Sequence, residues 1–386
     1  MTVAFSEEQL AIQEAARRFS ADRLAPDFQR LDVEGRLNRE AIEEMGALGL
    51  VGPSLPEDLG GLGAGSVTAG IVMEAVSEAD SSVAYVPLTA ALCGGIVAEF
   101  GTAALAEQVV PPVAQGKRLM ALGLTEPRGG SDAANLILNA QKTDGGYLLN
   151  GEKTSISMAA QADDIVLFAR TGEPDSGARG VSAFYLDLHS DGISRSSFDD
   201  LGARAIGRGS IHFDNVFVPD EHLLGDENAG FRQVMQGFDY SRALIGLQCI
   251  GAAAASLKET WDFIQERKAF GLELARYQGI TFPLAEHETF VTSCRLLCYE
   301  TLRLRDQGLP HTSEAAMVKW WAPKLACEAI QQCLLSHGHS GYSKDLPHQQ
   351  RHRDIFGFQI GDGTAQIMKL IIAREKIGRI AVQYQN

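Results

Sequence analysis

The sequence lacks any Cys-x-x-Cys pair, although it contains six cysteines. This absence excludes the usual zinc ribbon and the dithiol redox motif, and no metal site is predicted. Most of the cysteines fall in apolar stretches of helical character, where reduced core residues are expected. They are Cys93, Cys249, Cys294, Cys298, Cys327 and Cys333.

Long apolar runs and an excess of positive charge are missing as well. The longest uncharged stretches, such as residues 243–257, are shorter than the roughly 20 residues of a membrane-spanning helix. The N-terminus does not show the basic and then apolar pattern of a signal peptide, so we expect a cytoplasmic protein. A net charge of −15 argues against a general nucleic-acid role, which needs a basic face. A few local arginines or backbone N–H groups can still bind an anionic ligand.

The chain has 386 residues, of which 45% are apolar, enough for two or three domains with a large core. Helical periodicity dominates residues 1–116, strand-length segments occupy 117–226, and helical periodicity returns over 227–386. We therefore predict a mainly α protein with a central β-domain. That domain is expected to be a small antiparallel barrel or sandwich, and the C-terminal part a four-helix bundle.

Local signals mark several of the expected elements. Ser6 and Gln9 fit a capping box that opens the first helix. The Asp-Gly-Gly turn at 144–146 predicts a hairpin. The segments DDIVLFAR, GVSAFYLDL and SIHFDNVFV have the β-branched and aromatic content of strands. The C-terminal helices are expected at about 230–266, 278–307, 313–337 and 364–379.

Four short motifs combine glycines with polar side chains. In the loop TEPRGGSD, two glycines allow close backbone approach to a ring or phosphate, and Thr125 and Ser131 supply hydroxyls. Taken alone, this loop is equally typical of a connection between strands. NGEKTSIS and ERKAFG are likewise typical of a β-turn and of a helix end. IGDGTAQI holds Asp362 between two glycines, and Asp-Gly is ordinary turn chemistry.

In this order, however, the motifs resemble those of the acyl-CoA dehydrogenase family over essentially the whole chain. TEPRGGSD is similar to the family's Thr-Glu-Pro-x-x-Gly-Ser-Asp signature, and NGEKTSIS to its Asn-Gly-x-Lys-x-Trp-Ile-Thr segment. ERKAFG, HGHSGY and IGDGTAQI match its C-terminal landmarks. The resemblance implies the architecture that the changes of period predict independently.

The resemblance implies FAD-dependent dehydrogenation of an acyl-CoA to the 2-enoyl-CoA. Asp362 would remove the α-proton while flavin N5 takes the β-hydride. The backbone N–H of Asp362 and a ribityl hydroxyl of FAD would stabilise the enolate oxygen. An electron-transfer flavoprotein is the implied electron acceptor, and the protein is expected to be a homo-oligomer, most simply a tetramer.

Site residues carried over from the family fall into two groups. The residues expected to contact FAD are Thr125, Ser131, Ser157, Arg267, Phe270, Gln278, Gly338 and Thr364. Among them, Arg267 would reach the pyrophosphate of a neighbouring subunit's FAD, with Phe270 and Gln278 near the adenine. Those expected to contact substrate or order the region around the base are Ser131, Asp239, Arg242 and Gly363. Asp239 precedes Arg242 by three residues on a predicted helix and is expected to pair with it.

Several positions depart from the family pattern. Ser155 stands where a Trp usually covers the flavin, and His339 and Leu335 replace a Gly and a Gln, which we interpret as packing changes. Some relatives take their base from an earlier helix, but that position is Ser241 here. The base position itself holds Asp362 rather than Glu, which shortens the reach by about 1.5 Å.

The shorter base suggests an acyl group whose α-carbon belongs to a ring. Aspartate at this position also resembles the branch of the family that acts on thioesters of the cyclohexane-1-carboxyl-CoA type, which implies a role in alicyclic acid degradation. Three alternatives stay open. They are a nitroalkane-oxidase-like flavin oxidase, a dehydrogenase of straight or branched short-chain acyl-CoA, and a non-catalytic binding subunit. Lys369 occupies a position where many relatives carry Arg, and it does not discriminate between the alternatives.

Overall fold

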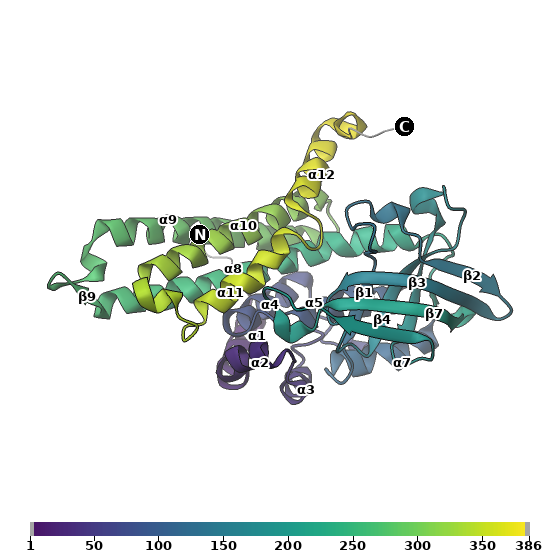
Figure 1. Ribbon diagram of the computed structural model, residues 1–386, viewed down its shortest axis with the longest axis horizontal. Coiled ribbons are helices and arrows are strands. Elements are labelled where there is room, and N and C mark those ends of the chain that lie inside the picture. The colour runs from purple at the N-terminus through teal and green to yellow at the C-terminus, as the bar shows by residue number, and fades with distance from the viewer. Residues whose placement is uncertain (1–3, 383–386) are drawn as a thin grey trace.

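The computed structural model describes residues 4–382 as a long helical body with a β-domain at one end (Figure 1). None of the helices in this described range is both long and apolar enough to cross a membrane. All six cysteines are buried and free, as the sequence predicts for most of them. The fold class predicted from the sequence, helical at both ends with a β-domain between them, is confirmed.

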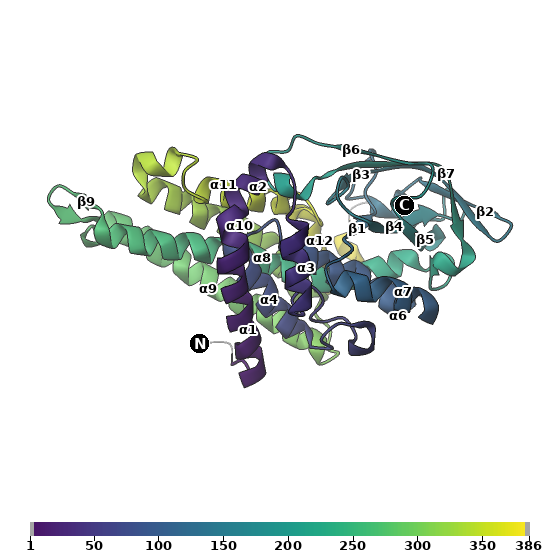
Figure 2. The same ribbon diagram turned by 90° about the horizontal axis from the view of Figure 1, so that it is seen from below.

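The N-terminal helices pack across the long C-terminal ones. Ser6 begins α1 through the predicted capping box: its hydroxyl accepts from the Gln9 N–H at 3.2 Å, and the Gln9 side chain accepts from the Ser6 N–H at 3.0 Å. Figure 2 shows α1 crossing the long helices at a steep angle. α4 lies between α1 and α8, and most of its residues are buried. The helices are α1 Glu7–Phe19, α2 Phe28–Glu34, α3 Arg39–Ala47, α4 Ser66–Ala79, α5 Tyr85–Thr89, α6 Gly95–Phe100 and α7 Ala103–Ala114.

The β-domain is one sheet with strand order β6-β7-β3-β2-β4-β5-β8, with β1 paired to β4. Its core strands β4 and β5 are almost wholly buried and carry the apolar runs seen in the sequence. The bounds are β1 Met120–Gly123, β2 Asn139–Thr143, β3 Gly146–Ile156, β4 Asp164–Arg170, β5 Val181–Asp187, β6 Ile193–Ser197, β7 Gly209–Pro219 and β8 Leu223–Leu224.

The predicted antiparallel arrangement needs one correction, because β1 and β2 both pair with β4 in parallel. Parallel neighbours need a long crossover, and the chain between β1 and β4 provides one that contains the β2–β3 hairpin. That hairpin has the predicted turn, with Gly145 at φ +72°. The sequence analysis did not predict β6, whose polar residues lack a strand-like apolar pattern.

In the described residues, five α-helices form the C-terminal part, and four of them match the predicted ranges to within two residues. α8, α9 and α10 run along the long axis, and α12 packs against α10 before projecting away from the body (Figure 1). A short hairpin, β9 Lys268–Ala269 and β10 Leu272–Glu273, joins α8 to α9 at the end remote from the β-domain. The helices are α8 Gly230–Glu266, α9 Gln278–Asp306, α10 Thr312–Ser336, α11 His348–Phe356 and α12 Ala365–Ile377.

Candidate active site

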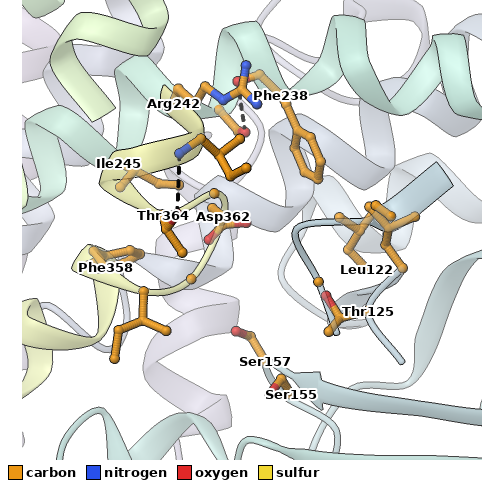
Figure 3. Close-up of a pocket in the computed structure, with 18 of the residues that line it drawn as sticks. Leu122, Thr125, Ser155, Ser157, Phe238, Arg242, Ile245, Phe358, Asp362 and Thr364 are labelled. Atoms are coloured by element: carbon orange, nitrogen blue, oxygen red, sulfur yellow. Dashed lines mark hydrogen bonds between the residues drawn. The ribbon is translucent and has the colours of Figure 1, made fainter. Parts of the chain in front are cut away.

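A cavity of about 1080 Å³ lies where the β-domain meets α5, α8 and the turn before α12. Figure 3 shows Thr125, Ser155 and Ser157 on the β-domain side, Phe238 and Arg242 on α8 opposite them, and Asp362 between the two walls. The cavity brings together most of the predicted site residues, which are far apart in the sequence. These are Thr125, Ser131, Ser157, Asp239, Arg242, Asp362, Gly363 and Thr364.

Four other predicted residues do not line this cavity. They are Arg267, Phe270, Gln278 and Gly338. Phe270 is 98% exposed in the turn between β9 and β10, at the end of the helical body opposite the β-domain (Figure 1). Within one chain, this group therefore cannot contribute to the cavity that holds Asp362.

Asp362 differs from the other acids of the cavity in having no hydrogen-bond or ion-pair partner among the described residues. Six carboxyl groups line the cavity, and five of them are hydrogen-bonded or ion-paired. Asp354, for example, accepts hydrogen bonds from the Ser81 hydroxyl at 2.8 Å and the Ala203 N–H at 2.6 Å. No side chain or backbone group within residues 4–382 donates a hydrogen bond to the Asp362 carboxylate. The six are Asp132, Asp200, Asp239, Asp354, Asp362 and Glu375.

The backbone of Asp362 is also unusual. Its φ of +53° lies in the left-handed region that L-residues other than Gly, Asn and Asp rarely adopt, and Gly363 follows at φ +95°. Across the described part of the chain, no acceptor takes a hydrogen bond from the Asp362 N–H. Thr364 then caps α12, its hydroxyl accepting from the Ile367 N–H at 3.3 Å. The turn thus leaves both a carboxylate and an N–H donor of one residue available at the cavity wall.

The charge on Asp362 is set by opposing effects. Burial raises the pKa of its carboxyl, whereas the positive charges of Lys319 and Arg242 lower it. The net direction is upward from the usual aspartate value. An unpartnered carboxylate whose pKa is raised is a stronger base than an exposed one, so the group is suited to accepting a proton from carbon.

Arg242 is ordered by the acid that the sequence predicts as its partner. Its Nη1 donates to Asp239 Oδ1 at 2.8 Å, and Thr312 donates to the other oxygen of Asp239 at 2.5 Å. The Nε of Arg242 is buried and has no hydrogen-bond partner among the described residues. A buried donor of this kind beside a cavity is available to an acceptor on a ligand.

The β-domain side of the cavity carries a row of hydroxyl groups. The side chains of Thr125, Ser131 and Ser157 make no hydrogen bond with any residue of the described range. A Cβ at Gly130 would lie 3.3 Å from Thr125 Oγ1, so glycine keeps this part of the loop open. Free hydroxyls beside open backbone fit a planar heterocycle with acceptor atoms along its edge, and the residues present are therefore compatible with a flavin ring.

A buried ion pair supports the loop that carries Thr125 and Ser131. Glu126 accepts from Lys153 Nζ at 2.7 Å and from the N–H groups of Ile137 and Leu138 at 2.7 and 2.8 Å. Lys153 is fully buried, and burial lowers its pKa to about 8. The motifs TEPRGGSD and NGEKTSIS are thus joined in space, which fixes the hydroxyl row relative to the sheet.

An apolar wall closes the cavity beside Asp362. Tyr85 and Phe358 stack with ring centroids 5.2 Å apart and planes inclined by 16°. Leu88, Leu92 and Ile245 also line the cavity. The sequence analysis did not single out Tyr85 or Phe358, because an aromatic residue in an apolar stretch has no local signal that separates a cavity wall from ordinary core.

The position expected to hold a Trp has a polar arrangement instead. Ser155, at φ +58°, accepts a hydrogen bond from Arg208 Nη1 at 2.8 Å. Arg208 also pairs with Asp200 and lies over the ring of Phe198, 5.0 Å from its centroid. An arginine network therefore lines the cavity where the resemblance predicts an aromatic side chain.

Comparison with known proteins establishes the family. The N-terminal, middle and C-terminal domain models of acyl-CoA dehydrogenase match residues 6–117, 121–216 and 228–377. The caffeyl-CoA reductase-Etf complex subunit CarC of Acetobacterium woodii is 34% identical to this chain, over 96% of this chain and 98% of the relative.

Solved structures agree with these matches. Butyryl-CoA dehydrogenase from Megasphaera elsdenii superposes with a TM-score of 0.94 at 30% identity, covering 98% of this chain and 100% of that one. The structure of PigA with FAD and proline gives a TM-score of 0.93 at 26% identity, with the same coverage.

The chain belongs to the acyl-CoA dehydrogenase family. It is an FAD-dependent oxidoreductase that acts on acyl-CoA. When bound, FAD supplies the hydride-accepting chemistry, and the protein supplies binding, orientation and acid–base groups.

Proposed function

We propose that this enzyme oxidises a ring-bearing acyl-CoA of the cyclohexane-1-carboxyl-CoA type to the 2-enoyl-CoA, with Asp362 as the base that removes the α-proton. One observation carries the assignment of the base. Of the six carboxylates around the cavity, Asp362 is the one without a hydrogen-bond or ion-pair partner in the described residues. A base must be free to accept its proton, whereas a carboxylate held by an ion pair loses that interaction on protonation.

The free N–H of Asp362 supports the same assignment. Removing a proton next to a thioester places negative charge on the carbonyl oxygen, and preorganised donors stabilise that charge. The Asp362 N–H has no acceptor in the described residues, and its neighbours Gly361 and Gly363, which carry no side chain, line the cavity on either side of it. Base and donor would then belong to one residue, so the thioester is fixed relative to both.

The apolar wall supports a compact acyl group. Tyr85 and Phe358 stack on the side of the cavity that carries Asp362, and a ring substrate would lie against the partly buried ring of Tyr85. An aspartate reaches about 1.5 Å less far than a glutamate, so the α-carbon must sit closer to the turn. A ring that contains the α-carbon has the bulk to press that carbon toward Asp362.

The test is anaerobic bleaching of the bound flavin. Purified FAD-loaded protein is mixed with cyclohexanecarboxyl-CoA, butyryl-CoA and a branched acyl-CoA, and the absorbance of the oxidised flavin is followed. We expect fastest bleaching with the ring substrate. Bleaching by butyryl-CoA alone would contradict the ring substrate, and rapid aerobic turnover of nitroalkanes with peroxide release would favour the oxidase alternative.

Two variants test the base. Asp362→Asn should retain FAD but lose bleaching by roughly 10³-fold or more, because the amide cannot accept the proton. Glu375→Gln is the matched control, since Glu375 lines the same cavity but lies beside Arg374. Full activity of Asp362→Asn would refute the assignment of the base.

A second candidate is the same chemistry in the direction of reduction. The observation that favours it is the similarity to a caffeyl-CoA reductase subunit. Asp362 would then deliver a proton to the α-carbon of a 2-enoyl-CoA, since forward and reverse reactions share their transition state. Reoxidation of dithionite-reduced protein by the 2-enoyl-CoA, faster than bleaching of oxidised protein by the saturated thioester, would support the reductive direction.

We further propose an electron-transfer flavoprotein as redox partner and a homotetramer as the functional assembly. The relative from Acetobacterium woodii is named as part of an Etf complex, which supports the first. The remote position of Arg267 supports an assembly of more than one subunit, because a family contact to FAD from there requires a neighbouring subunit. Arg267→Ala should lower FAD retention although Arg267 lies outside the cavity of its own chain. Unchanged FAD content would argue against the shared site.

A further inference from the structure

Lys319 is a buried cation in the middle of α10. It is 1% exposed, although lysine is among the residues least often found in a protein interior. Burying an ammonium group without partners is strongly unfavourable, so its surroundings must provide compensating interactions. Identifying those partners shows what the residue does.

All three donors of the Lys319 ammonium are used by one short turn. Nζ donates to the carbonyl oxygens of Phe358 at 2.7 Å, Gly361 at 3.0 Å and Gly363 at 3.2 Å. A lysine ammonium has three N–H donors, so the group is fully satisfied. Two of the three carbonyls directly flank Asp362, on its N-terminal and C-terminal sides.

The turn that Lys319 holds is conformationally costly. Asp362 at φ +53° and Gly363 at φ +95° are in the left-handed region, and such backbone persists where surrounding contacts enforce it. A Cβ at Gly363 would lie 2.5 Å from the Met368 side chain, so the packing there is close as well. Three hydrogen bonds from one rigidly buried side chain are a sufficient constraint.

Lys319 also differs from Arg242 in how its charge is compensated. Arg242 pairs with Asp239 at 2.8 Å, which offsets much of its field at the cavity. Lys319 forms no ion pair with any carboxylate in the described chain, so no paired carboxylate offsets its positive charge, which lowers the pKa of the nearby Asp362 carboxyl. The titratable groups that interact electrostatically with Asp362 come from α5, from the segment that follows α5, from α8 and from α10. They are Tyr85, Cys93, Arg242 and Lys319.

We infer that Lys319 is a positioning residue for the reaction: it holds the 358–363 turn so that the carboxylate and N–H of Asp362 face the cavity, and its charge favours the ionised base. This inference rests on the proposed role of Asp362. It extends that role, because Lys319 would set both the position and the pKa of the Asp362 carboxylate although Lys319 itself does not line the cavity.

The experiment compares Lys319→Met with Lys324→Met in the FAD-loaded protein. Lys324 lies on the same helix but is half exposed and paired with Glu328. For Lys319→Met we expect kcat to fall roughly 10-fold or more with KM little changed, since small displacements of a catalytic group have such effects. The acid limb of the kcat profile should move to higher pH. Lys324→Met should match the wild type in both.

Lys319→Gln separates the charge from the hydrogen bonds and serves if the methionine variant does not fold. Glutamine keeps two donors for the turn but has no charge, so the acid limb should still move while the loss of kcat is smaller. A purely structural lysine would lower the melting temperature and leave the acid limb where it is in the wild type. That outcome would overturn the inference about charge.

Hydrogen exchange at residues 357–364 tests the hold on the turn without any catalysis. Exchange in Lys319→Met should be at least about 10-fold faster than in the wild type and in Lys324→Met. If neither Lys319 variant folds, wild-type exchange is followed from pH 7 to pH 9.5, corrected for the intrinsic rate. The protection should fall as Lys319 loses its proton near pH 8, because burial lowers its pKa to about 8. Constant protection would refute the inference, whereas failure of every acyl-CoA to bleach the wild type would refute the proposed function instead.

Discussion

The ring of Tyr85 stacks on the ring of Phe358, with their planes inclined by 16°. Tyr85 comes from α5 and Phe358 from the turn that carries Asp362. The apolar wall of the cavity therefore contacts the same turn as the proposed base. This contact relates the shape of the substrate pocket to the position of the carboxylate.

Shortening Tyr85 should change the acyl preference. In Tyr85→Ala the wall loses a ring, and the kcat/KM ratio of longer straight-chain to ring-bearing acyl-CoA should rise roughly 10-fold, the range expected for changes in apolar pocket volume. Tyr85→Phe is the matched control, because it keeps the stack and removes the hydroxyl. Steady-state kinetics with both substrate types measures the ratio. An unchanged ratio in Tyr85→Ala would place the acyl group elsewhere.

Lengthening the base should lower activity rather than raise it. If the substrate is held for an aspartate, Asp362→Glu moves the carboxylate about 1.5 Å and should lower kcat on the preferred thioester roughly 10- to 100-fold. A straight-chain thioester should be affected less, since it can shift along the pocket. Higher activity of Asp362→Glu on every substrate would show that the pocket suits the longer base, contrary to the ring hypothesis.

The Glu126–Lys153 pair should be important for both stability and cofactor retention. Lys153→Met leaves a buried carboxylate without its cation and should lower the free energy of unfolding by about 3 to 5 kcal/mol. The loop with Thr125 and Ser131 then loosens, so FAD should dissociate more readily. Denaturant unfolding and absorbance after gel filtration measure the two effects. Lys142→Met removes an exposed pair with Asp220 and should change neither.

Stability should depend on pH through a buried carboxyl group outside the cavity. Burial raises the pKa of Asp80 to about 7 in the folded protein, whereas an aspartate in the unfolded chain titrates near ~3.9. Between these values the folded state binds more protons, so the free energy of unfolding contributed by Asp80 falls as the pH rises from about 4 to 7.

Asp80→Asn tests this dependence. The amide oxygen can still accept from the N–H groups of Ser82 and Val83, which Asp80 Oδ1 accepts at 2.8 and 3.0 Å. The variant should therefore show a smaller loss of stability between pH 5 and pH 7.5 in urea unfolding. Asp199→Asn, at a side chain that is 94% exposed, should keep the wild-type slope. Equal slopes for wild type and Asp80→Asn would contradict the prediction.

Local patterns in the sequence determined much of the fold. Helical period, the Ser6 capping box and the turn at Gly145 depend on residues close together in the chain, and the structure has them where the sequence places them. The i,i+3 pair of Asp239 and Arg242 is local in the same sense. The order of the motifs was sufficient to indicate the family, and it predicts Asp362 as the base.

Only the tertiary structure decided which residues surround those motifs. The partners of Asp354, which are Ser81 and Ala203, and the stack of Tyr85 on Phe358 join segments far apart in the chain, and no local period encodes them. The parallel pairing of β1 and β2 with β4 likewise depends on a crossover. In the sequence, Lys319 is a single charge in an apolar helix. Its proposed role depends on the contact with the carbonyl of Gly361, which is 42 residues away in the chain and is brought close by packing. The sequence thus predicts Asp362 as the base. The packing of α8, α10 and the turn before α12 leaves its carboxylate without a hydrogen-bond partner in residues 4–382, because hydrogen-bond partners are set by distance in space.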